Sequence, residues 1–113
     1  MINNFKCCCI YSNDPARYSV KVTNFTHLYV KFILKYTISG GISTKEIMLF
    51  RNEHRKFYYE NGATNVSVNI LDCSLPTTKL IYHECITQKT NLCFEISGTS
   101  ERIICTNLKY FIK

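Results

Sequence analysis

The sequence predicts an all-β protein, an antiparallel β-sandwich that is immunoglobulin-like or a small barrel, with about seven or eight strands. Three observations predict it. Polar and apolar residues alternate along most of the chain, as they do in strands that bury one face. Turn-forming residues recur about every ten residues, which is the spacing of short consecutive strands. No stretch long enough for a helix repeats its apolar residues with helical periodicity.

The first two strands are expected at 17–24 and 28–38. Tyr18, Val20 and Val22 share one face of the first strand, and the second strand alternates over its whole length. The polar link between them is short, so we expect the two strands to pair as a hairpin. A Ser-Gly-Gly sequence then ends the second strand.

The later strands follow the same pattern, although residues 45–51 fit a strand or a short helix equally well. Turn signals such as Asn61-Gly62 separate them. The remaining strands are expected at 54–60, 64–72, 79–86, 91–97 and 101–112.

A chain of 113 residues is expected to form one domain. We assign residues 13–113 to a single β-sandwich and residues 1–12 to a Cys-rich, flexible N-terminal segment. The most apolar stretch, 28–38, is too short to span a membrane and contains two lysines. The N-terminus lacks the apolar core of a signal peptide. We therefore expect either the mature part of a secreted protein or an intracellular protein.

The chain contains seven cysteines, well above ordinary usage. Cys73, Cys85, Cys93 and Cys105 each lie in or at the end of an expected strand. Bridges 73–85 and 93–105 would each span a strand–turn–strand unit, and the two other connectivities stay open. In an intracellular protein these residues would be buried free thiols. We favour a secreted protein with disulfides.

The other three cysteines are adjacent: Cys7, Cys8 and Cys9. Adjacent cysteines do not readily bridge to one another. One of them could bridge to the body of the domain, and the others could join two chains into a disulfide-linked homodimer. In an intracellular protein this cluster would instead be acylated and anchor the chain to a membrane.

The sequence lacks the motifs of common catalytic and metal sites. It contains no CxxC pair, no phosphate-binding loop and no HExxH or GxSxG sequence. His83 and Cys85 are expected on one strand face, but two residues make only a weak zinc site. A Cys–His nucleophilic pair has no supporting local motif. We expect no metal, no cofactor and no enzymatic activity.

The formal charge of +6 favours anionic partners, and it also favours solubility. Basic and aromatic residues interleave at 50–60, and a second group would share the outer face of the expected hairpin. A charged strand edge whose aromatic residues fill the core would explain the first group equally well. The candidate binding residues are Arg51, Arg55, Lys56, Tyr58, Lys21, Tyr29, Lys31 and Lys35.

Two glycosylation sequons occur near expected turns, at Asn24 and Asn65. About two sequons are expected by chance in a chain this rich in asparagine, serine and threonine, so they support secretion only weakly.

The spacing of the expected strands along the chain resembles that of immunoglobulin-like sandwiches, although the chain lacks their core tryptophan. This resemblance concerns architecture alone and implies no function. We expect a secreted, disulfide-containing module that binds a protein, a glycan or an anionic membrane surface, and we do not expect nucleic acid as a partner. The first alternative is a membrane-active β-sandwich of the cytolysin or defence type. The second is an intracellular, thiol-rich accessory protein.

Overall fold

Eight β-strands and no helix make up residues 16–108, the part of the chain that the computed structural model describes. No helix in this part could therefore cross a membrane. The strands are β1 (Arg17–Asn24), β2 (Val30–Ile38), β3 (Gly41–Leu49), β4 (Glu53–Glu60), β5 (Thr64–Asp72), β6 (Lys79–Ile86), β7 (Leu92–Thr99) and β8 (Arg102–Asn107).

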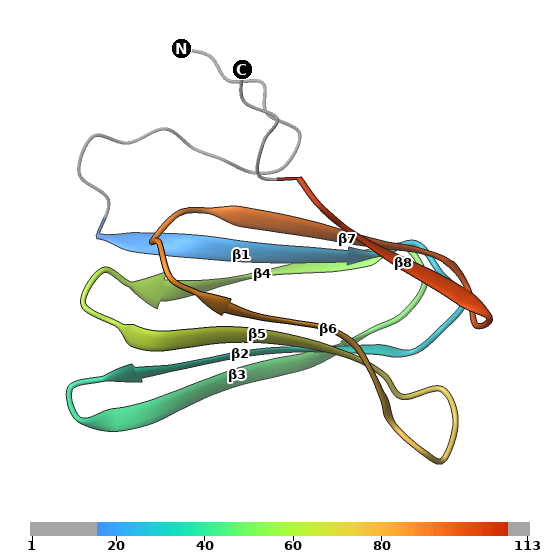
Figure 1. Cartoon of the computed structure of the whole chain (residues 1–113), viewed down its shortest axis with the longest axis horizontal. Helices are drawn as coiled ribbons and strands as arrows, with labels where there is room; N and C mark the ends of the chain where they lie inside the picture. The colour runs from blue at the N-terminus through green and yellow to red at the C-terminus, as the bar shows by residue number, and fades with distance from the viewer. Residues whose placement is uncertain (1–15, 109–113) are drawn as a thin grey trace, which may run out of the picture.

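The strands form two four-stranded sheets that stack face to face (Figure 1). The β1 sheet has the order β4-β1-β7-β8, and the β2 sheet has the order β3-β2-β5-β6. Every neighbouring pair is antiparallel except β1 and β7, which run parallel. The predicted fold class, a mainly antiparallel β-sandwich, is confirmed.

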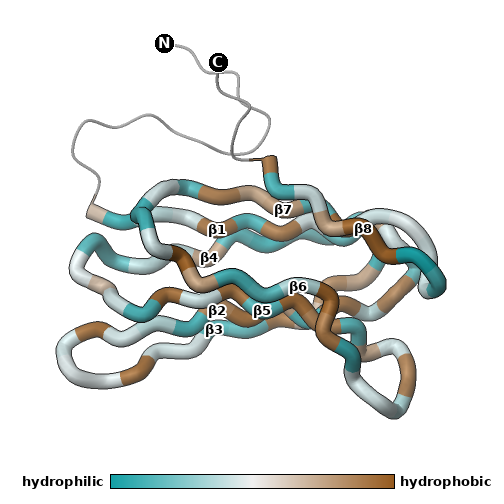
Figure 2. Tube along the Cα trace, in the orientation of Figure 1, coloured by the Kyte–Doolittle hydropathy of each residue, from teal (hydrophilic) through white to brown (hydrophobic). Residues whose placement is uncertain are grey.

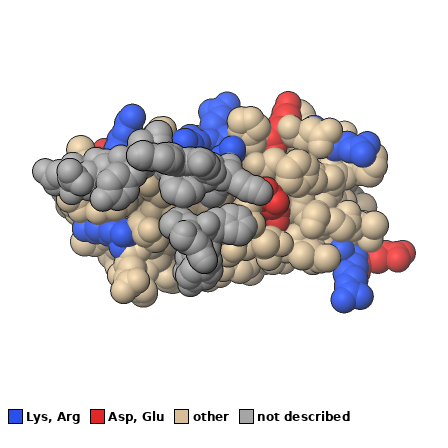
Figure 3. Space-filling view, turned by 90° about the horizontal axis from the view of Figure 1, so that it is seen from above, with Lys and Arg blue, Asp and Glu red and all other residues tan. Residues whose placement is uncertain are grey.

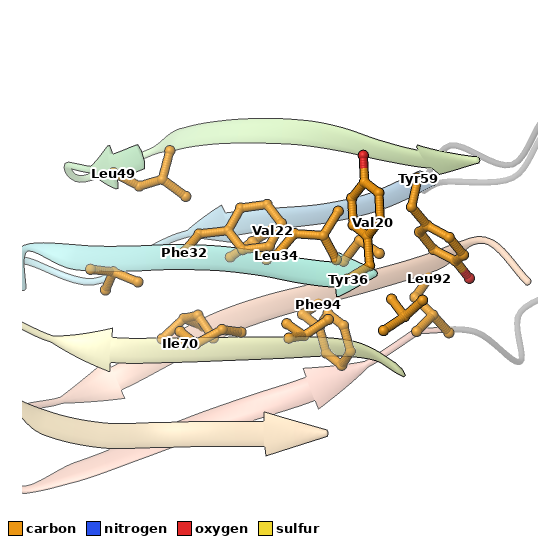
Figure 4. Close-up of a cluster of buried hydrophobic side chains, with 14 of the residues drawn as sticks. Val20, Val22, Phe32, Leu34, Tyr36, Leu49, Tyr59, Ile70, Leu92 and Phe94 are labelled. Carbon is orange, nitrogen blue, oxygen red and sulfur yellow. The ribbon is translucent and has the colours of Figure 1, made fainter. Parts of the chain in front are cut away.

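The core lies between the two sheets, where alternate residues of the central strands point inward. Val20 and Val22 of β1 face Phe32 and Leu34 of β2, and Phe94 of β7 completes the layer (Figure 4). Figure 2 shows the resulting alternation of apolar and polar residues along the strands. Each of these side chains is almost completely buried, which stabilises the fold by about 1.5–3 kcal/mol per residue.

The expected hairpin between the first two strands is wrong. β1 pairs with β4 and β7, whereas β2 pairs with β3 and β5. Residues 25–29 therefore carry the chain from one sheet to the other. The consequence is that Lys21 lies opposite Lys56 in the β1 sheet, while Lys31 belongs to the β2 sheet.

The ambiguous segment 45–51 is largely strand, since it forms the second half of β3. β3 pairs with β2 through a tight turn in which Ser39 and Gly40 both adopt positive φ angles, 53° and 80°. A two-residue hairpin turn of this type requires positive φ angles at both of its central residues.

Four connections meet at one end of the sandwich, on the right in Figure 1. They are 25–29, 50–52, 73–78 and the β7–β8 turn at 100–101. They meet there because β1, β3, β5 and β7 all end at this side. We call this side the loop end.

Candidate functional site

Exposed apolar side chains gather at the loop end. Seven large hydrophobic residues are exposed in the part of the chain that the structure describes, and five of them lie in or beside these loops. The five are Phe25, Tyr29, Phe50, Leu75 and Leu80. The other two are Ile42, in the β2–β3 hairpin at the opposite end, and Ile104 in β8. A concentration of this kind marks a surface that meets another molecule.

The apolar surface continues from the loop end onto the outer face of the β2 sheet. Tyr29 and Phe50 pack edge to face, with ring centroids 5.0 Å apart. In the next row, Lys31 of β2 pairs with Leu71 of β5, and Leu71 pairs with Leu80 of β6. The aliphatic stem of Lys31 can therefore lie against leucine while its ammonium group stays in water.

Asn24 holds the first of these loops in place. Its Nδ2 donates hydrogen bonds to the carbonyl oxygens of Leu28, at 2.8 Å, and Leu49, at 3.1 Å. Its Oδ1 accepts from the backbone N–H and the hydroxyl of Thr26, at 2.9 and 2.6 Å. The residue is completely buried. One side chain thus connects β1, the 25–29 loop and the end of β3.

A second set of hydrogen bonds fixes the 73–78 loop. The Ser74 backbone N–H donates to Oδ1 of Asp72, and the Tyr29 N–H donates to the Ser74 hydroxyl oxygen at 2.8 Å. The Cys73 N–H donates to the Tyr29 carbonyl oxygen, also at 2.8 Å. The loops that carry the exposed apolar side chains are therefore bonded to one another rather than independent.

A hollow of about 460 Å³ opens beside the loop end, between β3 and β4. Apolar side chains from β3 and polar ones from the start of β4 line it. The lining residues are Ile47, Leu49, Asn52, Glu53, His54 and Arg55.

The basic, aromatic stretch at 50–60 does not form a single surface. Arg51 lies in a loop at the loop end, and Arg55 lines the hollow. Lys56 lies opposite Lys21, and the guanidinium of Arg17 stacks 3.9 Å from the ring centre of Tyr58. In the face seen in Figure 3, Lys and Arg side chains are spread over the described surface, with Asp and Glu among them.

The second expected surface is also divided. Tyr29, Lys31 and Lys35 lie on the outer face of the β2 sheet, but Lys21 lies in the other sheet. Lys31 Nζ is 4.0 Å from Oε2 of Glu46, a long, solvent-accessible pair that contributes little to stability.

The expected bridges 73–85 and 93–105 are not formed: Cys73, Cys85 and Cys105 are free thiols. Cys85 pairs with Ser67, six residues from Cys73, so these two cysteines are about 20 Å apart along the hairpin. Cys105 pairs with Ile96, three residues, or about 10 Å, from Cys93. A disulfide needs Cα atoms within about 7 Å.

The two other connectivities fail as well, because Cys85 lies on the outer face of the β2 sheet, away from Cys93 and Cys105 in the β1 sheet. No disulfide therefore joins two of the described cysteines. Cys93 itself is not a free thiol. Cys7, Cys8 and Cys9 lie outside the described residues, so their bridging, dimer-forming or acylated roles stay predictions.

Cys105 lies on the inner face of β8, partly buried against the core. Burial, and then the nearby Glu84 carboxylate, raise the pKa of this thiol to about 12. Burial, followed by a hydrogen bond from its hydroxyl to Glu84, likewise raises the pKa of Tyr82 to about 12. Cys105 therefore stays protonated and unreactive at neutral pH.

The two sequons differ in how accessible their asparagine side chains are for glycosylation. A glycan would be attached to Nδ2 of Asn24, but this atom is buried and donates two hydrogen bonds, so Asn24 is not available in the folded domain. Asn65 is exposed at the start of β5, and its glycosylation stays a prediction.

Among residues 16–108, no group of three or more Cys, His, Asp or Glu side chains is arranged to hold a metal ion. His83 and Cys85 do lie together, with Nε2 and Sγ 3.5 Å apart.

Four of the five exposed apolar residues at the loop end, all except Tyr29, were missed as candidates. Phe25 and Leu75 stand in segments that read as turns, so the strand pattern gave them no role. An apolar residue in a predicted turn was the signal for them, because such a residue has no strand face to bury it.

Comparison with known proteins identifies a fold but no family. No protein-family model and no curated protein sequence matches the chain. Among solved structures, the membrane-binding domain of pneumolysin superposes with a TM-score of 0.65 at 11% identity, covering 80% of this chain and 95% of that domain.

Larger toxins contain a similar domain. The cytotoxin suilysin from Streptococcus suis gives a TM-score of 0.64 at 13% identity, and the human-specific toxin intermedilysin gives 0.62 at 9% identity. Each match covers 80% of this chain but only 23% of the toxin. At these identities the likeness establishes that this chain shares the β-sandwich fold of these toxin domains.

Proposed function

We propose that this domain binds membrane surfaces and places the apolar side chains of the loop end among the lipid headgroups. One observation carries the proposal: among residues 16–108, five of the seven exposed large hydrophobic residues lie at this one end, in or beside loops that hydrogen bonds hold together. Aromatic and aliphatic side chains next to basic ones suit the interface of a bilayer.

The size of the apolar surface predicts weak, reversible binding. Each of the five side chains is about half exposed, so burying the rest of each contributes about 1 kcal/mol, and all five contribute about 5 kcal/mol. This is close to the free energy with which one myristoyl chain binds a membrane.

Charge at the loop end itself is balanced. Three cationic residues in and beside these loops stand with three carboxylates, which leaves no net charge there. The residues are Arg51, Lys79, Arg102, Glu53, Asp72 and Glu101. The formal charge of +6 on the whole chain still attracts anionic lipid, so we expect binding to strengthen modestly with anionic lipid and to weaken with salt.

The likeness to the membrane-binding domain of pneumolysin supports the proposal, since it covers nearly all of that domain. Because the chain spans under a quarter of the length of the whole toxins, membrane lysis is not part of the proposal. The likeness to toxin domains also supports an extracellular location, which we include as a proposal.

Vesicle flotation tests the proposal. The protein is mixed with phosphatidylcholine vesicles, with and without phosphatidylserine, and the floated fraction is measured. Leu75→Ser and Phe50→Ser should each reduce binding several-fold. Ile42→Ser is the matched control, because Ile42 is 73% exposed at the opposite end. Binding that all three variants reduce equally, or that none reduces, would contradict the proposal.

A protein or glycan partner remains the second candidate. The observation that favours an anionic partner is the direct pairing of Lys21 with Lys56 on the outer face of the β1 sheet. Like charges at this position are unfavourable unless an anion is bound between them. Retention on a heparin column that Lys56→Gln abolishes, without loss of vesicle binding, would support this candidate.

A further inference from the structure

Three polar side chains form a connected row on the outer face of the β2 sheet, where β5 and β6 pair. The register places Asn69 opposite His83 and Ser67 opposite Cys85. Oδ1 of Asn69 lies 2.7 Å from Nδ1 of His83, and Nε2 of His83 lies 3.5 Å from Sγ of Cys85. The histidine and the cysteine are exposed, so a small molecule in solution can reach them.

The hydrogen bond to Asn69 defines the tautomer of the imidazole. An amide oxygen only accepts, so Nδ1 of His83 carries the proton that it donates to Asn69. When the ring is neutral, Nε2 presents its lone pair to the thiol of Cys85. A nucleophile, a base and a third group that orients the base is the arrangement that activates a thiol.

The charged residue in register with Cys85 on this face is cationic. Lys35 lies in the same cross-strand row as Cys85, with Ser67 between them. The other charged groups on this face of the strands are Lys31 and Glu46, which pair with each other. The carboxylate next to Cys85 in the sequence, Glu84, belongs to the inner face, where it accepts a hydrogen bond from Tyr82.

We propose that Cys85 is a reactive thiol that forms mixed disulfides with low-molecular-weight disulfides, with His83 as its proton acceptor and Asn69 as the positioning residue for His83. The Cys85 thiol transfers its proton to Nε2. The thiolate attacks one sulfur of the disulfide, and the electron pair of the broken S–S bond goes to the other sulfur. The leaving thiolate takes the proton from Nε2. Cys85 is oxidised, and one small thiol is released.

The two other free thiols among the described residues provide internal comparisons. Both are partly buried, Cys105 against the core and Cys73 beside Tyr29 at the loop end.

The first experiment measures the alkylation rate of each cysteine by iodoacetamide in the full chain, using peptide mass spectrometry. We expect Cys85 to react faster than Cys73 or Cys105 at pH 7. His83→Phe should slow Cys85 several-fold at pH 7 and should no longer slow it at about pH 10, where a thiol ionises without help. Asn69→Ala should slow it less. His54→Phe, which removes an exposed histidine from the other sheet, is the matched control.

The second experiment uses the unmodified chain, so it does not depend on the folding of a variant. With glutathione disulfide as the probe at pH 7, the mixed disulfide should form on Cys85 before Cys73. Mixed-disulfide formation on Cys73 as fast as on Cys85, or a Cys85 alkylation rate at pH 7 that His83→Phe leaves unchanged, would overturn the proposal.

Discussion

Replacing Asn24 by alanine should both destabilise the domain and loosen the loop end. The amide side chain makes four hydrogen bonds, and three of its partners are backbone groups: the carbonyls of Leu28 and Leu49 and the N–H of Thr26. All three residues are buried, so water cannot easily replace the lost partner. At about 1 kcal/mol for each backbone group, Asn24→Ala should cost about 3 kcal/mol.

Urea unfolding followed by circular dichroism measures this cost. With a slope of about 1.5 kcal/mol per molar urea, the midpoint should fall by about 2 M. Gln88→Ala removes an exposed amide from the β6–β7 loop and serves as the control. If Asn24→Ala moved the midpoint no further than Gln88→Ala does, Asn24 would not be the residue that joins these three segments.

The same variant connects stability to function. Under conditions where Asn24→Ala is still folded, the 25–29 loop loses its attachment to β3, and Phe25 and Tyr29 lose their fixed positions. Vesicle binding should then fall although no exposed apolar residue has been changed. Unchanged binding by the folded variant would show that the apolar side chains act without a preformed loop end.

Three further predictions concern other parts of the sandwich. Gly98 has a φ of 97°, and a Cβ there would lie 2.1 Å from the Arg102 carbonyl oxygen, so Gly98→Ala should lower the melting temperature by several degrees. Lys56→Glu should turn the repulsion with Lys21 into an attraction and raise stability by about 0.5 kcal/mol, a gain measured by urea unfolding that high salt should remove. The pKa of the Cys105 thiol is raised in the folded state, so its contribution to stability is complete below about pH 9 and is lost as the pH rises toward 12. Unfolding at pH 8 and pH 10.5 should show this loss, and Cys105→Ala should make it smaller.

The strands could be predicted from the sequence because burial of one strand face is a local property. Apolar residues occupy every second position from Val30 to Tyr36 in the sequence, and these alternate side chains do line the core. The pairing of strands is not local. The 25–29 segment reads as a hairpin turn, but Asn24 directs it across to the other sheet.

The cysteine pairings failed for the same reason. Cys73 and Cys85 do belong to adjacent strands, as their spacing predicts, but the register of β5 and β6 places them at different levels of the hairpin. Spacing along the chain identifies neighbouring strands, whereas bond formation depends on which residues stand directly opposite.

The row formed by Asn69, His83 and Cys85 shows where a sequence stops being informative. His83 and Cys85 are two residues apart, so any strand over 79–86 places them on one face, as the sequence predicts. Asn69 comes from another strand, and a register slip of one residue would put a core valine or isoleucine beside His83 instead. The reactivity of Cys85 therefore tests the register of β5 and β6 as well as the chemistry. If Asn69→Ala slows Cys85 and the equivalent change at Ser67 does not, both the pairing and the role of His83 are supported by one measurement.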